Sequence, residues 1–135
     1  MQFKASEKRL LGRTGLSVTA LGLGTAPLGG LYAPVSRADA DALLEAGWES
    51  GIRYFDSAPM YGYGRCEHLL GDMLREKSER AVVSTKVGRL MTNERAGRTL
   101  PPAPPKNPLD SGWHNGLNFR EVFDYSYDGV MRSFD

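Results

Sequence analysis

The amino-acid sequence predicts an α/β fold built from successive parallel βα units. Short runs rich in β-branched and aromatic residues alternate along the chain with longer segments of helical periodicity. The order strand, helix, strand, helix, strand is typical of βαβ units, whose crossovers are right-handed and whose strands all run in the same direction. The carboxyl ends of the predicted strands therefore meet on one face of the sheet.

The first predicted elements are a short hairpin and the strand that follows it. The stretch KRLLGRTGLSVTALGLG, residues 8–24, places apolar residues on both sides of a Gly-Arg-Thr-Gly turn. Leu21 and Leu23 then continue as a buried strand toward Gly24. We therefore expect a hairpin that leads directly into the first strand of the sheet.

The first predicted helix carries signals at both of its ends. In SRADADALLEAGWESG, residues 36–51, Ser36 is the expected N-cap, Asp39 stands at the capping-box position, and Gly51 ends the helix. The apolar residues expected on its buried face are Leu43, Leu44 and Trp48.

The second βα unit follows at once. The run IRYFDS, residues 52–57, is predicted to form a strand, and GRCEHLLGDMLREK, residues 64–77, has the spacing of an amphipathic helix. The third strand is expected within AVVSTKVG, residues 81–88. The apolar positions of the second helix are Cys66, Leu69, Leu70, Met73 and Leu74.

The pattern changes after the third strand. Residues 87–125 are expected to form one long loop, which holds five of the eight prolines, and PPAPPKNP within it can be neither helix nor inner strand. A connection of this length in a compact domain is usually a functional lid or partly disordered. A last helix is predicted from the N-cap Ser126 onward, with an apolar face that begins with Val130, Met131 and Phe134.

Three strands with open edges cannot cover both faces of a parallel sheet. We therefore expect residues 1–135 to be part of a larger domain, and the chain to be a fragment of it.

Composition excludes several classes of function. The 135 residues are 41% hydrophobic and 24% charged, with a net charge of +1, so no overall field favours nucleic acid or an anionic membrane. The single cysteine, Cys66, cannot form an internal disulfide. The sequence has no apolar run long enough to span a bilayer, and its first residues are too polar for a signal peptide. These features favour a reducing, cytoplasmic setting.

Three polar residues are predicted to converge on the carboxyl-terminal face of the sheet. In GIRYFDSAPMYGYG, residues 51–64, Asp56 ends the second strand and Tyr61 lies in the loop after it, while Lys86 ends the third strand. Active sites of βα architectures lie on this face. Each residue alone also has a structural explanation: Asp56 as a cap, Tyr61 as a packing aromatic, or Lys86 as a solvated charge.

A tyrosine next to a lysine is suited to donating a proton. Tyrosine side chains have a reference pKa of about 10, so donation near neutral pH requires the phenolate to be stabilised by up to about 4 kcal/mol. An ammonium group at about 4 Å supplies about 1 kcal/mol in water and about 4 kcal/mol at an effective dielectric constant of about 20. The pair therefore needs a partly dry pocket, and Asp56 would keep Lys86 in place and charged.

The stretches LGRTGLSVTALGLGT, GIRYFDSAPMYG and STKVG resemble the N-terminal part of the aldo-keto reductase family. The resemblance implies a (β/α)8 TIM barrel preceded by a hairpin, and an NAD(P)-dependent oxidoreductase. In that family a tyrosine donates a proton to a carbonyl oxygen while nicotinamide delivers hydride, helped by a lysine, an aspartate and a histidine. Asp56, Tyr61 and Lys86 match the first three. The histidine, which follows the fourth strand, has no counterpart in this chain.

Such a barrel has about 250 residues, so residues 1–135 would cover roughly its first half. The resemblance implies Gly24, Thr25 and Asp56 as cofactor-binding residues and leaves open whether the cofactor is NADP or NAD. The long loop and FDYSYDGVMRS look most like the branch that contains aldose dehydrogenases and pyridoxal dehydrogenases. The implied substrate is a small carbonyl compound or sugar, with an aldose 1-dehydrogenase-like reaction.

Other interpretations of the sequence are less favoured or stay open. Pro27 stands where a Rossmann fingerprint needs its third glycine. His68 is expected at the surface and Cys66 in the core, without the spacing of a metal site. Trp113, with His114, is either part of a substrate mouth or an exposed loop aromatic. The alternative function is a non-catalytic barrel that binds nucleotide and partners, or a truncated product without activity.

Overall fold

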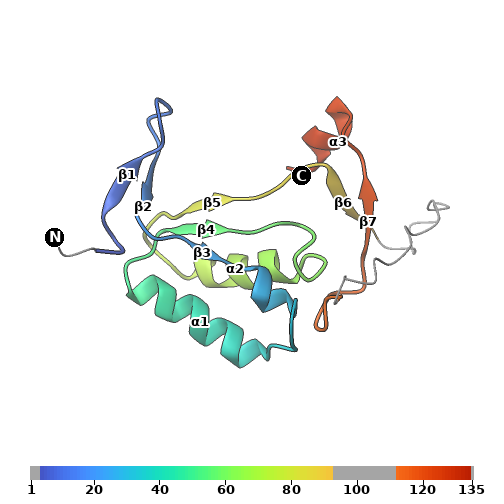
Figure 1. Ribbon diagram of the computed structural model, residues 1–135, viewed down its shortest axis with the longest axis horizontal. Helices are drawn as coiled ribbons and strands as arrows, with labels where there is room; N and C mark the ends of the chain where they lie inside the picture. The colour runs from blue at the N-terminus through green and yellow to red at the C-terminus, as the bar shows by residue number, and fades with distance from the viewer. Residues whose placement is uncertain (1–3, 93–111, 135) are drawn as a thin grey trace.

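The computed structural model describes residues 4–92 and 112–134 of the chain. Its described part contains a two-stranded antiparallel sheet, a three-stranded parallel sheet and a second two-stranded antiparallel sheet, in that order along the chain. Two longer helices, α1 and α2, lie together on one side of the parallel sheet (Figure 1). The order of elements confirms the predicted βαβ pattern.

The predicted N-terminal hairpin is confirmed. Strands β1 (Lys8–Leu10) and β2 (Ser17–Thr19) pair in antiparallel register, and they lie beyond the amino-terminal ends of the parallel strands (Figure 1). The buried hydroxyl of Thr19 accepts a hydrogen bond of 3.1 Å from the backbone N–H of Arg53. This bond ties the hairpin to the start of β4.

The central sheet consists of β3 (Leu23–Gly24), β4 (Tyr54–Asp56) and β5 (Val82–Ser84), in the order β3-β4-β5. All neighbouring strands are parallel, and the register aligns Gly24 with Asp56 and Asp56 with Ser84. The prediction that Leu21 belongs to the first buried strand is wrong. Leu21 precedes β3 and is 45% exposed.

Helix α1 (Arg37–Glu49) begins as predicted. The Ser36 hydroxyl accepts a hydrogen bond from the Asp39 N–H at 3.0 Å and donates one to the Asp39 carboxylate at 2.7 Å. The chain leaves the helix through Gly51, whose φ of 86° lies in the left-handed region.

The predicted buried face of α1 is correct at Leu44 and Trp48 and wrong at Leu43, which is 47% exposed. Consecutive residues are rotated by about 100° around a helix. The stripe that faces the sheet therefore runs through Ala40, Leu44 and Trp48 and leaves Leu43 outside.

Helix α2 (Arg65–Arg75) buries the face that the sequence predicted. It packs with α1 and β4 around Phe55, which has no exposed surface. A short 3-10 helix, η1 (Ala26–Gly29), connects β3 to the segment before α1 and contacts α2. The buried core cluster consists of Leu28, Ala40, Leu44, Trp48, Ile52, Phe55, Cys66, Leu69, Leu70 and Met73.

The expectation of one continuous loop over residues 87–125 is wrong in part. Strands β6 (Arg89–Thr92) and β7 (Arg120–Phe123) lie within it and pair in antiparallel register. Their pairing joins residues about thirty positions apart in the sequence, so no short-range pattern predicts it. The Pro-rich stretch PPAPPKNP lies outside the described residues.

Helix α3 (Tyr127–Arg132) starts at the predicted N-cap Ser126, whose hydroxyl accepts from the Gly129 N–H at 3.1 Å. Its predicted apolar face is largely uncovered in the structure, since Met131 is 47% exposed and Phe134, just past the helix, is 69% exposed. Among the described residues, no helix has both the length and the apolar character that crossing a membrane requires.

The two adjacent leucines of α1 give a test of the helix orientation. In the protein expressed from the complete coding sequence, Leu44→Ala should lower the free energy of unfolding by about 2–5 kcal/mol, because it leaves a cavity in the core. Leu43→Ala should change it by no more than about 0.5 kcal/mol. Urea denaturation measures both, and equal losses for the two variants would contradict the orientation described.

The 135-residue chain expressed alone should associate. Strands β3 and β5 are the edges of the described parallel sheet, and unpaired edges with exposed apolar residues promote contacts between molecules. Sedimentation velocity at several protein concentrations measures this. A monomer that melts in one sharp two-state transition would show the expectation to be wrong.

Candidate active site

The parallel register brings Asp56 and Lys86 together at the carboxyl ends of β4 and β5. The Lys86 ammonium donates hydrogen bonds to Asp56 Oδ2 and to the backbone carbonyl of Ser57, both at 2.9 Å. Because adjacent parallel strands end at the same edge of the sheet, these groups meet without a long excursion of either loop. The predicted convergence of Asp56 and Lys86 is therefore seen in the structure.

Ser84 is a member of this cluster that sequence reasoning missed. Its hydroxyl donates to Asp56 Oδ1 at 2.7 Å and lies 3.2 Å from the Tyr54 hydroxyl. Each carboxylate oxygen of Asp56 thus has its own donor. The signal was present in the sequence, since Ser84 stands two residues before Lys86 and side chains two apart share one face of a strand.

The cluster shifts the titration of both charged residues in favour of the ion pair. Partial burial by itself would raise the pKa of Asp56, but the hydrogen bonds from Lys86 and Ser84 and the lysine charge outweigh it and lower that pKa. Burial likewise would lower the pKa of Lys86, but the Asp56 carboxylate and the Tyr61 side chain outweigh it and raise that pKa. Lys86 therefore keeps its charge over a wide pH range.

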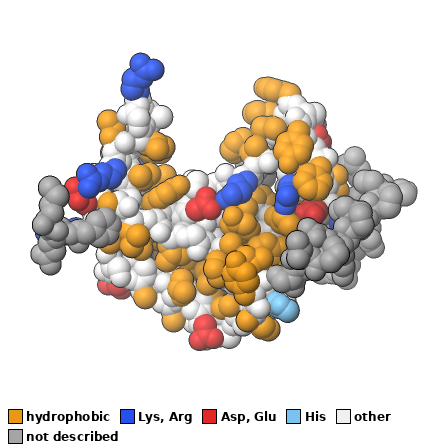
Figure 2. All heavy atoms as spheres, in the orientation of Figure 1, with side chains coloured by type: hydrophobic (Ala, Val, Ile, Leu, Met, Phe, Trp, Pro, Cys, Tyr) orange, Lys and Arg blue, Asp and Glu red, His pale blue; other side chains and the backbone are white. Residues whose placement is uncertain are grey.

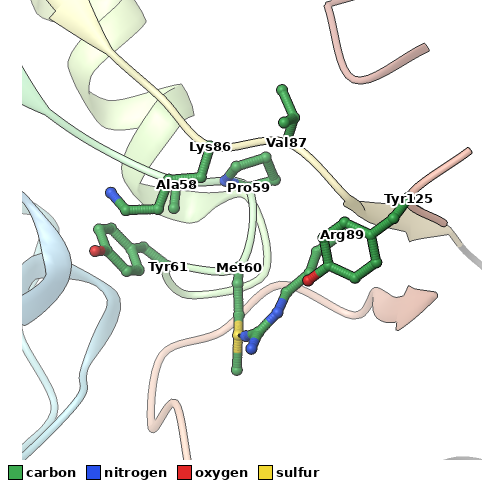
Figure 3. A pocket seen from close by; sticks show the side chains of 8 residues that line it. All are labelled: Ala58, Pro59, Met60, Tyr61, Lys86, Val87, Arg89 and Tyr125. Carbon is green, nitrogen blue, oxygen red and sulfur yellow. The ribbon is translucent and has the colours of Figure 1, made fainter. Parts of the chain in front are cut away.

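Tyr61 lies beside the ion pair, on the loop between β4 and α2. The Lys86 Nζ atom is 4.8 Å from the centroid of the Tyr61 ring, and Figure 3 shows the two side chains next to each other. The backbone N–H of Tyr61 donates to the Ala58 carbonyl at 3.0 Å, in a turn that holds the loop close to the strand end. All three predicted catalytic residues therefore lie together.

The shape of the Tyr61 loop is fixed by a contact between two backbones. A Cβ atom added at Gly29 would stand 2.6 Å from the Gly62 nitrogen, and one added at Gly62 would stand 2.9 Å from the Gly29 Cα. Gly62 also has a φ of 63°, in the left-handed region. A side chain at either position would separate η1 from the loop and displace the neighbouring Tyr61.

Trp113 packs against Tyr61, with ring centroids 5.7 Å apart and an interplanar angle of 45°. Its segment is held by the Asn115 Oδ1 atom, which accepts from the Val35 N–H at 2.6 Å, and by the Leu117 N–H, which donates to the Gly62 carbonyl at 2.9 Å. Trp113 is thus half-buried, whereas His114 is exposed. The interpretation of Trp113 as an exposed loop aromatic is therefore wrong.

A pocket of about 280 Å³ opens at the carboxyl ends of the strands and includes Tyr61 and Lys86 in its wall. Trp113 is not part of this wall, although its ring packs against the Tyr61 ring. On this side of the molecule, Figure 2 shows acidic and basic side chains meeting in the hollow between the β1–β2 hairpin and the C-terminal elements. The pocket is lined by Ala58, Pro59, Met60, Tyr61, Lys86, Val87, Arg89 and Tyr125.

Arg89 and Tyr125 come from the β6–β7 region and were not anticipated from the sequence. The Arg89 guanidinium contacts the Met60 sulfur and lies 4.8 Å from the centroid of the Phe123 ring. The Tyr125 ring lies on Gly88, where an added Cβ would stand 2.2 Å from a ring atom. Both residues reach the pocket only because β6 and β7 pair, which no short-range signal predicted.

The cofactor-side residues at the end of β3 differ in exposure. Gly24 is exposed, and no heavy atom lies within 4 Å of the position that a Cβ would take, so bare backbone faces open space next to Asp56. Thr25 is fully buried, and its hydroxyl bonds the Asp56 carbonyl and the Ser57 hydroxyl, each at 3.0 Å. Gly24 and Asp56 are thus register partners at the ends of β3 and β4, and both are at least partly exposed.

Cys66 and His68 lie where the sequence placed them. Cys66 is fully buried in α2, its thiol donates to the Thr25 carbonyl at 3.1 Å, and burial raises its pKa to about 11. His68 is exposed. Within residues 4–92 and 112–134, no group of three or more His, Cys, Asp or Glu side chains is arranged to hold a metal ion.

Comparison with known proteins supports the same architecture. The model of the Aldo/keto reductase family matches residues 20–121. Over 135 residues, the chain is 95% identical to a pyridoxal 4-dehydrogenase from Microbacterium luteolum, and it covers 40% of that protein. It is also 40% identical over 124 residues to a D-threo-aldose 1-dehydrogenase from a Pseudomonas species, with 88% of this chain and 35% of that protein aligned.

A solved structure has the same arrangement of elements. A protein from Pseudomonas aeruginosa that has been assigned as an aldo-keto reductase superposes with a TM-score of 0.63 and 32% sequence identity. The match covers 96% of this chain and 40% of that structure. The chain thus spans about two fifths of the length of these relatives, and its parallel βα units form part of a TIM barrel. From residues 20–121 and the fold that they build, the chain belongs to the aldo/keto reductase family.

Proposed function

We propose that this chain is part of an NAD(P)-dependent oxidoreductase that interconverts a carbonyl group and an alcohol. Tyr61 is the proton donor, Lys86 stabilises the phenolate that forms, and Asp56 holds Lys86 in position and charged. The observation that carries the proposal is that Lys86 contacts both Asp56 and Tyr61, while Tyr61 and Lys86 both lie in the wall of one pocket. A tyrosine with a charged lysine beside it is suited to donating a proton to a bound carbonyl oxygen.

The proposed division of work between the residues follows from their contacts. When the carbonyl oxygen lies at the Tyr61 hydroxyl, the phenolic proton moves to that oxygen, and the nearby ammonium lowers the energy of the negative charge left on Tyr61. Asp56 accepts no proton in this scheme, because its carboxylate is already bonded by Lys86 and Ser84. In the direction of oxidation the same proton returns to Tyr61.

The proposed cofactor is NADP or NAD, which supplies or accepts the hydride when bound. Gly24 and Asp56 are proposed to contact its nicotinamide end, since they are register partners at the ends of β3 and β4 and are not buried. The part proposed for Thr25 is indirect: its buried hydroxyl holds the Asp56 backbone in register. NADP and NAD differ at the adenosine phosphate, and the proposal assigns no residue to that part of the cofactor.

The proposed substrate is a small aldehyde, ketone or sugar lactol. The first candidate is pyridoxal, because a relative with 95% identity is a pyridoxal 4-dehydrogenase. An aldose is the second candidate, favoured by the 40% identity with a D-threo-aldose 1-dehydrogenase. A substrate screen with both compounds and both cofactors distinguishes these cases. Residues 1–135 would then be the first part of the oxidoreductase domain, in a cytoplasmic protein that acts on small molecules.

The alternative is a protein without catalysis, which binds nucleotide through the same strand ends. Oxidation of pyridoxal or a sugar by the protein from the complete coding sequence would exclude this alternative. Cofactor binding without turnover of any carbonyl compound would favour it.

Replacing Tyr61 separates proton donation from binding. Tyr61→Phe should reduce turnover by at least about a hundredfold, because it removes the proton donor and leaves the ring that packs against Trp113. Cofactor affinity should change less than about threefold, since the hydroxyl is not needed for it. Steady-state kinetics and cofactor titration measure the two effects. Unchanged turnover would refute the role of Tyr61.

Replacing Asp56 tests whether it keeps Lys86 charged. Asp56→Asn removes the carboxylate that raises the pKa of Lys86, so the ammonium should be lost at a lower pH than in the native protein. The alkaline limb of kcat/KM should therefore move to lower pH, which kinetics between about pH 6 and pH 11 would reveal.

Ser84→Ala is the matched control for this substitution. It removes one hydrogen bond to Asp56 and keeps the charge next to Lys86, so it should leave the alkaline limb nearly in place. An alkaline limb that does not move in Asp56→Asn would show that the carboxylate does not control the charge of Lys86.

A further inference from the structure

We propose that Arg89 forms a subsite that binds an acidic oxygen of the substrate, at the end of the substrate away from its reacting carbonyl. The inference deepens the proposed function and rests on it for the identity of the reacting end. It assigns to the substrate a carboxylate or phenolate group in addition to its carbonyl. Arg89 would thus determine specificity and take no part in proton transfer.

The first argument is the place of Arg89 in the pocket. Figure 3 shows Lys86 and Tyr61 on one side of the pocket and Arg89 and Tyr125 on the other, with Met60 toward the Arg89 side. A ligand that fills this pocket therefore touches both the side formed by Tyr61 and Lys86 and the side formed by Arg89 and Tyr125. The pocket volume of about 280 Å³ is suited to a ligand of one substituted ring.

The second argument is the charge of the wall. Among the described residues that line the pocket, two are cations, Lys86 and Arg89, and none is a carboxylate. Lys86 is engaged by the Asp56 carboxylate, which leaves Arg89 as the cation that can face the far end of a ligand. A planar guanidinium presents paired N–H groups that match the two oxygens of a carboxylate.

The third argument is how Arg89 is held. Its guanidinium lies 4.8 Å from the centroid of the Phe123 ring and forms an ion pair with Glu121, whose Oε2 atom is 3.7 Å from Arg89 Nη1. In the pocket it contacts the Met60 sulfur, which is a weak acceptor. Phe123 and Glu121, both on β7, therefore hold the guanidinium in place, and among the described residues of the pocket wall its contact is with Met60.

The remaining wall favours a ring between the two polar ends. Pro59, Met60, Val87 and Tyr125 supply apolar and aromatic surface, and the Tyr125 ring is fixed against Gly88. Such a surface packs a flat ring better than a heavily hydrated chain. The ligand class that fits is an aromatic or heteroaromatic aldehyde that bears an acidic oxygen.

The test compares two aldehydes of similar size in the protein expressed from the complete coding sequence. In the native protein kcat/KM should be higher for para-carboxybenzaldehyde than for para-methylbenzaldehyde. Arg89→Met, which keeps an unbranched apolar stem and removes the guanidinium, should lower kcat/KM about tenfold or more for the carboxylated aldehyde, through KM rather than kcat. For the methylated aldehyde it should change kcat/KM by less than about threefold.

Arg89→Lys is the conservative variant, since it keeps the charge without the planar pair of donors. It should restore part of the preference for the carboxylated aldehyde. If Arg89→Met lowered kcat/KM equally for both aldehydes and Arg89→Lys restored neither, Arg89 would serve only to stabilise the antiparallel pair of strands β6 and β7. That result, or a native protein without preference between the aldehydes, would overturn the proposal.

A binding measurement separates this inference from the proposed reaction. Calorimetric titration with para-methylbenzoate, in the presence of NADP or NAD, requires no turnover. Binding that weakens about tenfold or more in Arg89→Met and is retained in Tyr61→Phe would support the subsite even if the native protein oxidised neither aldehyde. Equal affinity of the native protein and Arg89→Met for para-methylbenzoate would overturn it.

Discussion

The register of three parallel strands is the constraint on which the site depends. Gly24, Asp56 and Ser84 stand side by side because β3, β4 and β5 end at the same level, and a shift of one residue in β4 would turn the Asp56 side chain to the opposite face of the sheet. The buried Thr25 hydroxyl strengthens that register by bonding the Asp56 carbonyl. Helices α1 and α2 pack against Phe55 and so hold β4 on the helix-covered face of the sheet. Packing far from the chemistry thus decides which groups meet at the surface.

Water limits what the ion pair can do by itself. The side chains of Lys86 and Asp56 are 49% and 41% exposed, so their mutual attraction is strongly screened and contributes no more than about 1 kcal/mol to stability. The same ammonium becomes several times more effective beside a phenolate once a ligand displaces water from the pocket and lowers the local dielectric constant. The arrangement therefore suits a site whose electrostatic work begins when ligand covers it. The backbone contact between Gly29 and Gly62 keeps Tyr61 in position beforehand, which reduces the ordering needed on binding.

Sequence reasoning reached those parts of the fold that short-range patterns control. The helix caps at Ser36 and Ser126 and the helical spacing of α2 are local patterns. The meeting of Asp56, Tyr61 and Lys86 follows from the positions of the strand ends. The exposure of Leu43 was missed because two adjacent leucines cannot both face the sheet, and a linear pattern does not say which one does. Arg89 and Tyr125 were missed for a different reason. They enter the pocket through a pairing of distant strands that depends on tertiary contacts, and neither residue has a distinctive neighbourhood in the sequence. Trp113 was named, but its packing against Tyr61 depends on Asn115 and Val35, eighty residues apart.

Cys66 gives the molecule an internal reporter. It is the single thiol of the sequence, it lies beneath the strand ends, and its hydrogen bond to the Thr25 carbonyl connects α2 to the residue that holds Asp56. A buried thiol with a pKa of about 11 reacts with alkylating reagents only when the surrounding structure opens. The rate of Cys66 alkylation in native conditions therefore measures how often the strand ends beneath the candidate active site separate from α2. Ligands that rigidify the strand ends become detectable by mass spectrometry through a slower reaction, without any engineered label.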